Sequence, residues 1–544
     1  MDESKYSSQK RCIYWGLFLI ILTTAAIRYP LLEVPLERDE GEYAYAAQLI
    51  LQGIPPYKSM YSMKLPGIYG IYALILTIFG QTHQGIHLCL LFINAATIIM
   101  IFFLVKRLIN PIAGISAAAS FAFLSLGQSV LGISANSEHF VILFAVSSAS
   151  LLLNGIKSQK LLLLFFSGIC AGFSFLVKQH GVSFIIFGAI LILTQIYKNN
   201  SISPKNIVYQ ALFFIVGSVL PYVITLVFFY YLGVFNKFWF WTVEYALSYT
   251  DLIPLDIARK NFVRSVVQVL KSSPAIWIVS GTGLIAALVN KKNGLDKHFV
   301  LLFFVFSFIA IFPGFYFRPH YFILLLPAAS IFFGAGIVAL SESIGKTSLF
   351  SHKNSFSILL ILICLSSTLF IQRTFLFQMS PRQVSRLTYG LNPFPESLEI
   401  KDIIQKLSKK EDRIAVLGSE PQIFFYSNRH SATGYVYMYP LMECHDFAKQ
   451  MQIEMIQEIE KAAPELLIIV NVRASWLQRS DTHKLIFEWL NSYRSKYYRI
   501  LCLVEIGREK TLYHWIPDII LPPKSSRWML IMKRIPKKAT KKVE

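Results

Sequence analysis

Long apolar runs constrain this chain more than any other feature of its sequence. Apolar residues make up 54% of its 544 residues and charged residues only 15%, against roughly 25% charged residues in soluble domains. Such a mixture cannot cover a water-exposed surface, and about eleven of the runs approach the length of about 20 residues that a bilayer-spanning helix needs. We therefore expect a polytopic α-helical membrane protein. The predicted spans lie near residues 12–32, 84–105, 111–132, 139–155, 161–177, 181–197, 207–232, 274–290, 298–316, 320–340 and 355–372.

Basic residues between these runs predict how the chain is oriented in the membrane. Every second connection is basic, and cytoplasmic loops carry an excess of lysine and arginine. We therefore expect a protein of the plasma (inner) membrane whose N-terminus lies in the cytoplasm. The net charge of the chain is +21, and many of its basic residues would then lie near acidic lipid headgroups. No nucleic acid is expected as a partner. The basic connections are 5–11, 106–107, 157–160, 198–205, 291–297 and 346–353.

The chain changes character after Arg373, where short apolar runs alternate with polar helical stretches. This alternation predicts a small α/β domain with a largely parallel sheet, placed outside the cell by an odd number of spans. We thus divide the chain into a membrane domain, 1–375, with a first outer loop at about 33–83, and an extracytoplasmic domain, 376–544. The expected strands are 413–418, 465–472 and 498–506, the expected helices are 400–409, 440–463 and 482–493, and residues 537–544 form a basic tail.

The segment after the first span gathers acidic residues at the membrane surface. Glu37, Asp39, Glu40 and Glu42 lie there around Arg38, and a helix over 41–52 would lie flat on the membrane with Asp39 and Glu40 at its N-terminus, where anions are favoured. One interpretation is a capped interfacial helix with solvated acids. The other is a carboxylate base that removes the proton of an acceptor hydroxyl, which is a poor nucleophile at neutral pH.

Three basic residues on the predicted outer side are candidates for binding a lipid phosphate. Lys64 stands alone before a stretch from 65 to 105 that contains no formally charged residue, Lys178 lies in a very short outer loop, and Arg318 precedes an apolar run. An ammonium can act as a point charge toward a phosphate, and a guanidinium can bind it through two hydrogen bonds. Snorkelling of the side chain toward water is the alternative for each.

Further polar residues begin two predicted spans on the same side. Glu138 and His139 follow Ser134–Ser137, and His320 follows Arg318. These three residues could join Asp39 around an acceptor or a divalent cation. A polar start of a span explains them equally well.

The order of these motifs resembles the C-type glycosyltransferase superfamily, in particular bacterial family 39, protein O-mannosyltransferase-like and lipid A aminoarabinose transferase-like proteins. The resemblance covers the first 340 residues and is carried by RDEGEYAYAAQLILQG, Lys64-Leu65-Pro66-Gly67, SANSEHF, Lys178 and RPHYFILLLPA. The Asp-Glu element is its most specific part. Relatives often have Lys-Pro-Pro where this chain has Lys64-Leu65-Pro66, and an aspartate in the loop that holds Glu138.

The resemblance implies a fold, an activity and roles for particular residues. The fold is the membrane bundle of this superfamily, and the activity is transfer of a hexosyl or pentosyl group from a polyprenyl-phosphate donor to a hydroxyl of a lipid, glycan or protein in the cell envelope, with inversion and in one step. Asp39 falls on the catalytic base, with Glu40 beside it, Lys64 on the contact to the carrier phosphate and Lys178 on a second basic contact. Some members bind a divalent cation and others need none, so no cofactor is certain.

Three other functions fit a polytopic protein with an outer domain. A transporter or lipid flippase would have charged pairs and broken helices near mid-membrane, whereas these charges gather on one side. An O-antigen ligase-type enzyme also uses lipid-linked saccharides but needs no Asp-Glu pair directly after the first span. A sensor would bind glycans without turnover.

Overall fold

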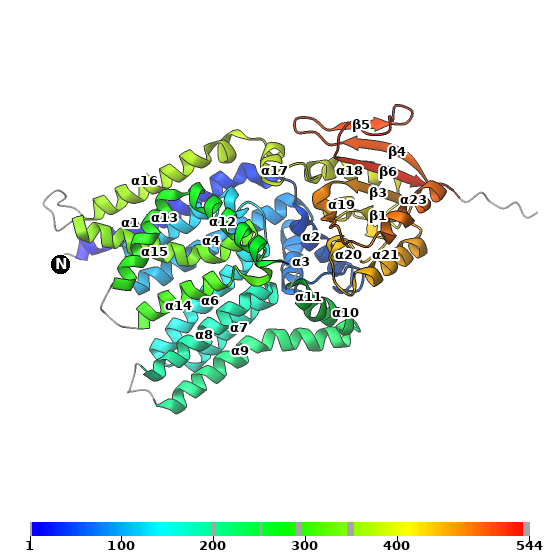
Figure 1. The fold of residues 1–544 in the computed structure, drawn as a ribbon. Coiled ribbons are helices and arrows are strands. Elements are labelled where there is room, and N and C mark those ends of the chain that lie inside the picture. The colour runs from blue at the N-terminus through cyan, green and yellow to red at the C-terminus, as the bar shows by residue number, and fades with distance from the viewer. Residues whose placement is uncertain (1–2, 198–202, 251–252, 290–294, 345–352, 537–544) are drawn as a thin grey trace, which may run out of the picture.

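A helical bundle and a sheet domain lie end to end in the computed structural model, which describes residues 3–197, 203–250, 253–289, 295–344 and 353–536 (Figure 1). The N-terminus lies at the end of the bundle that is far from the sheet domain. The bundle helices are α1 (Glu3–Arg28), α4 (His83–Leu108), α5 (Pro111–Leu124), α6 (Ser137–Ser158), α7 (Leu161–Val177), α8 (Val182–Leu193), α9 (Pro204–Tyr231), α12 (Leu255–Ser272), α13 (Pro274–Val289), α14 (Leu295–Ile309), α15 (Leu326–Ile344) and α16 (Lys353–Arg373).

Several bundle helices are long and apolar enough to cross a bilayer. Six segments of the described chain meet both criteria, and the pair α12 and α13, bent by 104°, would add a seventh. The chain is thus a multi-pass membrane protein, while the number of eleven spans stays a prediction, as does the division of the chain at residue 375. The six segments are Arg11–Glu33, His83–Leu108, Ser137–Ser158, Pro204–Tyr231, Pro319–Ser343 and Asn354–Gln378.

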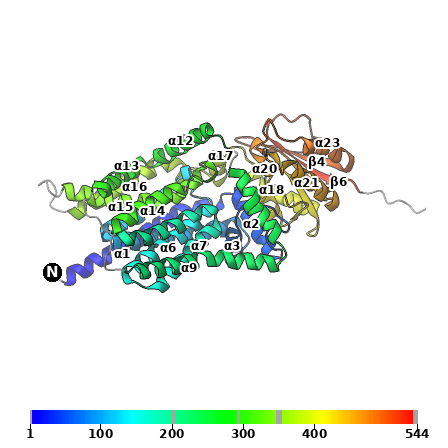
Figure 2. The same cartoon turned by 60° about the horizontal axis from the view of Figure 1, so that its bottom comes forward.

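Short helices fill the junction between the bundle and the sheet domain. They are α2 (Arg38–Leu51), α3 (Gly67–Phe79), α10 (Phe235–Trp239) and α11 (Ala246–Thr250), and a π-helical turn, Phe240–Tyr245, links the last two. Figure 2 shows α2 between the bundle and the helices of the sheet domain. Nearly every residue of α2 is buried, because the helix packs against both parts. The expectation that this segment lies flat on the membrane stays a prediction.

Two glycines allow the close approaches that fix this junction. A Cβ atom at Gly41 of α2 would lie 2.6 Å from the backbone nitrogen of Gln422 in the sheet domain. A Cβ atom at Gly67, the first residue of α3, would lie 2.5 Å from the carbonyl oxygen of Leu176 in α7. Real Cβ atoms do not approach so closely, so the backbone reaches these positions only without a side chain.

The sheet domain contains six strands with the order β2-β1-β3-β6-β4-β5. β1 is parallel to β2 and β3, whereas β6 is antiparallel to β3 and β4, and β5 is antiparallel to β4. The sheet is therefore mixed, and the expectation of a largely parallel sheet is wrong. The elements are α17 (Pro381–Tyr389), α18 (Phe394–Leu407), β1 (Arg413–Leu417), α19 (Gln422–Ser427), β2 (His430–Ser431), α20 (Tyr439–Met442), α21 (Ala448–Ala462), β3 (Leu466–Asn471), α22 (Arg473–Trp476), α23 (Leu485–Tyr497), β4 (Tyr498–Glu505), β5 (Leu512–Trp515) and β6 (Trp528–Arg534).

The C-terminal strand explains why the expectation of a largely parallel sheet is wrong. The three expected strands correspond to β1, β3 and β4, but β6 was not expected, and it inserts between β3 and β4. An antiparallel strand needs only a loop to return, not a crossover helix, so the helix–strand alternation further upstream carries no signal for it. The basic tail 537–544 and parts of the basic connections 198–205, 291–297 and 346–353 lie outside the described residues.

Candidate active site

A cavity of about 350 Å³ lies where several loops of the bundle meet the sheet domain. It is lined by residues from α2, the loop before α3, the α7–α8 connection, the π-helical turn, the loop before α15 and the sheet domain. Five of the eight residues predicted for the site line this cavity: Asp39, Lys64, Lys178, Arg318 and His320. Glu40, Glu138 and His139 are not part of its lining. The bundle thus brings together side chains that are up to about 280 positions apart.

In the first turn of α2, three consecutive charged side chains point in three different directions. The helix begins with a reciprocal cap, in which a carboxylate oxygen of Glu37 accepts from the backbone N–H of Glu40 and a carboxylate oxygen of Glu40 accepts from that of Glu37, each at 3.2 Å. Successive side chains on a helix point about 100° apart. Asp39 consequently faces the cavity, while Arg38 faces the sheet domain and Glu40 faces the bundle.

Lys64 joins two carboxylates on the cavity wall. Its Nζ donates to Oδ1 of Asp39 and to Oε2 of Glu42, each at 2.7 Å. Both acids line the cavity, but the Asp39 side chain is 17% exposed and that of Glu42 only 1%, so Asp39 is the more accessible of the two. The Tyr69 hydroxyl donates to the other oxygen of Glu42 at 2.8 Å, which fixes Glu42 beneath the lysine.

Electrostatics keep both members of the Asp39–Lys64 pair charged. Burial favours the neutral form of Asp39, but the positive charge of Lys64 outweighs it and holds the pKa of Asp39 well below its usual range. Burial likewise opposes the charge of Lys64, but the two carboxylates raise the pKa of Lys64 above its usual value. Two aromatic faces, Tyr43 at 4.6 Å and Tyr437 at 5.1 Å from Nζ, flank the ammonium and add a cation–π attraction.

A second ammonium–carboxylate pair lies across the cavity. Lys178 donates a hydrogen bond to Oε1 of Glu138, and its Nζ lies 4.5 Å from the centre of the Tyr321 ring. Nε2 of His320 lies 3.8 Å from the same carboxylate oxygen. Glu138 is fully buried behind Lys178, so the geometry gives Glu138 the role of a counter-ion. Two ammonium groups, from Lys64 and Lys178, and the guanidinium of Arg318 therefore border one space.

Glu40 and His139 occupy positions that differ from the sequence-based expectation. Oε1 of Glu40 contacts Nε2 of His87 at 2.9 Å and accepts from the backbone N–H of Ala135 at 2.6 Å, so this residue links α2 to the bundle. Glu40 is not part of the cavity lining, and a catalytic role for it stays a prediction. His139 is fully buried, and its two ring nitrogens have no hydrogen-bond partner among the described residues.

The structure gives no support to a metal-binding role for Glu138, His139 and His320. Within the described part of the chain, no group of three or more His, Cys, Asp or Glu side chains is arranged to hold a metal ion. The one carboxylate among the three is paired with Lys178. The divalent cation stays an untested option of the sequence analysis.

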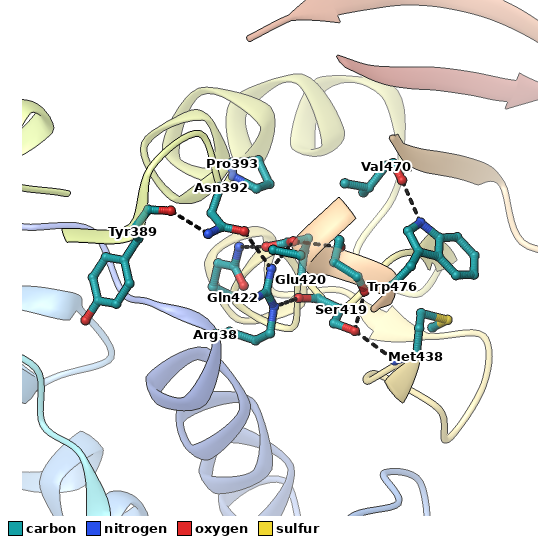
Figure 3. A network of polar contacts seen from close by, with 12 residues as sticks. Arg38, Tyr389, Asn392, Pro393, Ser419, Glu420, Gln422, Met438, Val470 and Trp476 are labelled. Atoms are coloured by element: carbon teal, nitrogen blue, oxygen red, sulfur yellow. Dashed lines mark hydrogen bonds and ion pairs between the residues drawn. The ribbon is translucent and has the colours of Figure 1, made fainter. Parts of the chain in front are cut away.

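Arg38 attaches the first turn of α2 to the sheet domain through a buried network of hydrogen bonds (Figure 3). Its guanidinium donates to Oε1 of Glu420 at 2.7 Å and to Oδ1 of Asn392 at 3.1 Å, and Nε donates to the carbonyl oxygen of Ser419. Glu420 also accepts from Ser475 at 2.7 Å and from Gln422 at 2.8 Å. Every acceptor on Arg38 belongs to the sheet domain, so this domain holds α2 at the cavity.

Sequence reasoning did not find the residues that the sheet domain contributes. Tyr437, Tyr439 and Pro440 line the cavity, and the Tyr437 hydroxyl donates to Oδ1 of Asp39 at 2.6 Å. The alternating tyrosines at 435, 437 and 439 are the one signal that could have drawn notice. Nothing in their local pattern indicates which distant carboxylate they meet.

Comparison with known proteins supports the fold assignment. Residues 64–224 match the family model described as dolichyl-phosphate-mannose-protein mannosyltransferase. The search among curated protein sequences found no significant match. The matched region begins at Lys64 and contains Glu138 and Lys178.

Similar solved structures cover nearly the whole chain. ArnT from Cupriavidus metallidurans in the apo state superposes with a TM-score of 0.57 at 14% identity, over 95% of this chain and 97% of that one. Its complex with undecaprenyl phosphate gives 0.56 at 12% identity with the same coverage. The apo oligosaccharyltransferase from Archaeoglobus fulgidus gives 0.51 at 13% identity, over 96% of this chain and 76% of that one. The expected C-type glycosyltransferase fold is confirmed.

Proposed function

We propose that this chain, which has the C-type glycosyltransferase fold, is an inverting glycosyltransferase. It moves a sugar from a polyprenyl-phosphate donor to a hydroxyl acceptor on the outer face of the plasma membrane. The observation that carries the proposal is the arrangement of Asp39 and Lys64, a carboxylate and an ammonium 2.7 Å apart on one cavity wall. ArnT was solved with undecaprenyl phosphate, and the Archaeoglobus fulgidus enzyme AglB with dolichol phosphate and a peptide, which supports a lipid-phosphate donor here.

The cavity offers the charges that binding of the donor requires. A polyprenyl-phosphate sugar carries a negative phosphodiester, and Lys64, Lys178 and Arg318 all border the space where it would lie. Charge-assisted hydrogen bonds to phosphate are among the stronger polar contacts in proteins. The polyprenyl tail would extend between the bundle helices into the lipid, while the sugar faces Asp39.

Donor binding would also change the base. In the structure Lys64 is shared between Asp39 and Glu42, and this charge keeps the proton affinity of Asp39 low. A phosphate that draws Lys64 toward itself removes part of that stabilisation, so the pKa of Asp39 rises and the carboxylate becomes a better base. The base is therefore strengthened only when the donor is in place.

The reaction is a single displacement. Asp39 accepts the proton of the acceptor hydroxyl while the oxygen forms a bond to the anomeric carbon. The bond from that carbon to the phosphate oxygen breaks, and its electron pair leaves with polyprenyl phosphate. Lys64, Lys178 and Arg318 stabilise the negative charge that develops on the departing phosphate. Attack from the side opposite to the leaving group inverts the anomeric configuration.

The test is a transfer assay with purified protein in lipid nanodiscs. A panel of polyprenyl-phosphate hexoses and pentoses is offered with lipid, glycan and peptide hydroxyl acceptors, and release of polyprenyl phosphate is followed. The proposal predicts release that depends on the acceptor, together with a product of inverted configuration. Binding without turnover would instead indicate a sensor, and movement of intact donor across the bilayer would indicate a flippase.

A further inference from the structure

The sheet domain places one tyrosine directly on the proposed base. Tyr437 lies in the segment between β2 and α20, and its hydroxyl donates to Oδ1 of Asp39 at 2.6 Å. Its ring also lies 5.1 Å from Nζ of Lys64. Tyr437 is thus a side chain of the sheet domain that contacts both members of the Asp39–Lys64 pair, although it lies 398 positions from Asp39 in the chain.

The hydrogen bonds to Asp39 are distributed unequally between its two oxygens. Lys64 and Tyr437 both donate to Oδ1, and no side-chain or backbone group in the described part of the chain donates to Oδ2. A carboxylate with one oxygen held by two donors has a fixed orientation. Oδ2 is then the atom that can receive a proton from an acceptor hydroxyl in the cavity.

The two side chains that donate hydrogen bonds to Asp39 respond differently when the polyprenyl-phosphate sugar binds. Lys64 carries the charge that a phosphate attracts, so it leaves Asp39 in part. Tyr437 has no charge to offer the phosphate, because burial, together with the nearby charge of Asp39, raises the pKa of Tyr437 well above its usual value. The phenol therefore keeps its proton and its hydrogen bond to Oδ1 throughout the reaction.

We propose that Tyr437 is a positioning residue that orients the Asp39 carboxylate for proton transfer, so that the sheet domain completes the active site. This inference rests on the proposed function, in which Asp39 Oδ2 accepts the acceptor's proton while polyprenyl phosphate leaves. Tyr437 neither gains nor loses a proton. Its contribution is to hold Oδ1 while Lys64 moves toward the phosphate.

The variant that tests this role is Tyr437→Phe, which removes the hydroxyl and keeps the ring beside Lys64. Tyr435→Phe is the control, because Tyr435 lies in the same segment and donates its hydroxyl to a carboxylate oxygen of Glu454 at 2.6 Å, away from the cavity lining. Both variants lose one hydrogen bond to a carboxylate. Only one of them loses it at Asp39.

Loss of the Tyr437 hydroxyl is expected to lower kcat about 10- to 100-fold while the donor KM stays within about twofold. A hydrogen bond to a carboxylate favours its charged form, so its loss raises the pKa of Asp39 and moves the acid limb of the kcat–pH profile to higher pH. The other charged or titratable groups around Asp39 stay unchanged in this variant: Glu37, Glu42, Tyr43, Lys64, Arg318, His320, Tyr321, Tyr389 and Tyr439. Tyr435→Phe should leave kcat and the profile as in the wild type.

A measurement without turnover separates this inference from the proposed function. Infrared difference spectra of the purified wild-type protein and Tyr437→Phe, each against its Asp39→Asn counterpart, report the titration of the Asp39 carboxyl. A higher pKa in Tyr437→Phe, but not in Tyr435→Phe, supports the positioning role. An unchanged pKa or an unchanged kcat in Tyr437→Phe overturns it, even if the wild-type protein transfers sugar. A wild-type protein that transfers no sugar refutes the proposed function instead, and the catalytic role of Tyr437 with it.

Discussion

Replacing Arg38 by methionine should lower the free energy of unfolding, because it removes the contacts that attach the first turn of α2 to the sheet domain. The Arg38 side chain is 10% exposed and that of its partner Glu420 is 0% exposed. Removing the guanidinium would leave Glu420 a buried charge with only the donors from Ser475 and Gln422. Breaking a buried pair on one side typically costs about 3–5 kcal/mol, and the two remaining donors place our expectation near about 3 kcal/mol.

The free energy of unfolding, measured by denaturant titration in detergent micelles, checks this value. Arg38→Met combined with Glu420→Gln should recover more than about 1 kcal/mol, because the second change removes the unpaired charge. Lys157→Met is the control, since its pair with Asp296 is 31% and 44% exposed and exposed pairs contribute about 0–1 kcal/mol. The reasoning is refuted if Arg38→Met costs no more than the control, or if the double variant is no more stable than Arg38→Met.

Three further predictions concern the cavity and its borders. Lys64→Met should weaken binding of polyprenyl phosphate about 10- to 100-fold in a calorimetric titration, because it removes a charge-assisted contact worth about 1.5–3 kcal/mol; unchanged affinity would exclude phosphate binding by Lys64. Gly41→Ala should destabilise the protein by about 1–3 kcal/mol, because its Cβ would lie 2.6 Å from the Gln422 nitrogen; wild-type stability would contradict the tight junction. Burial raises the pKa of Glu443 to about 7 from its ordinary 4.5, so the folded state binds more protons and stability falls as pH rises from about 4.5 to 7. Glu443→Gln should remove that fall, a total of about 3 kcal/mol at most, in thermal unfolding at pH 5 and pH 8; parallel curves for both proteins would contradict it.

The membrane part of the fold could be predicted because its signal is local. Apolar runs of bilayer length require helices wherever they occur, and the described helices α4, α6, α9 and α16 overlap expected spans, with ends that differ by up to three residues. The number of spans is harder to predict, because short apolar helices such as α5 and α7 fall below bilayer length. Length and composition alone do not decide whether such helices cross.

The candidate site could be predicted in the part that belongs to the bundle. Asp39, Lys64, Lys178 and Arg318 were expected on one side from the alternation of basic loops, and they line one cavity. Glu40 was expected beside the base, but its neighbours Ala135 and His87 come from other segments. A sequence shows that a residue is charged, but it does not show which distant group pairs with that charge.

The contribution of the sheet domain could not be predicted for a similar reason. Tyr437 meets Asp39 at a junction where Arg38, from the same turn of α2, is held by Ser419 and Glu420. These contacts join segments about 380 positions apart. The mixed order of the sheet depends likewise on where β6 inserts, which is set by tertiary packing and not by local pattern.

The most direct test of the proposed function is the turnover of Asp39→Asn. The variant keeps the size of the side chain but cannot accept the proton of a hydroxyl, so acceptor-dependent release of polyprenyl phosphate should fall about 10²- to 10⁴-fold. Polyprenyl phosphate should bind at least as tightly as to the wild type, because Lys64 loses a competing carboxylate. Glu33→Gln, which changes a carboxylate that is 60% exposed before α2, should retain wild-type turnover. Transfer at the wild-type rate by Asp39→Asn would contradict the assignment of Asp39 as the base.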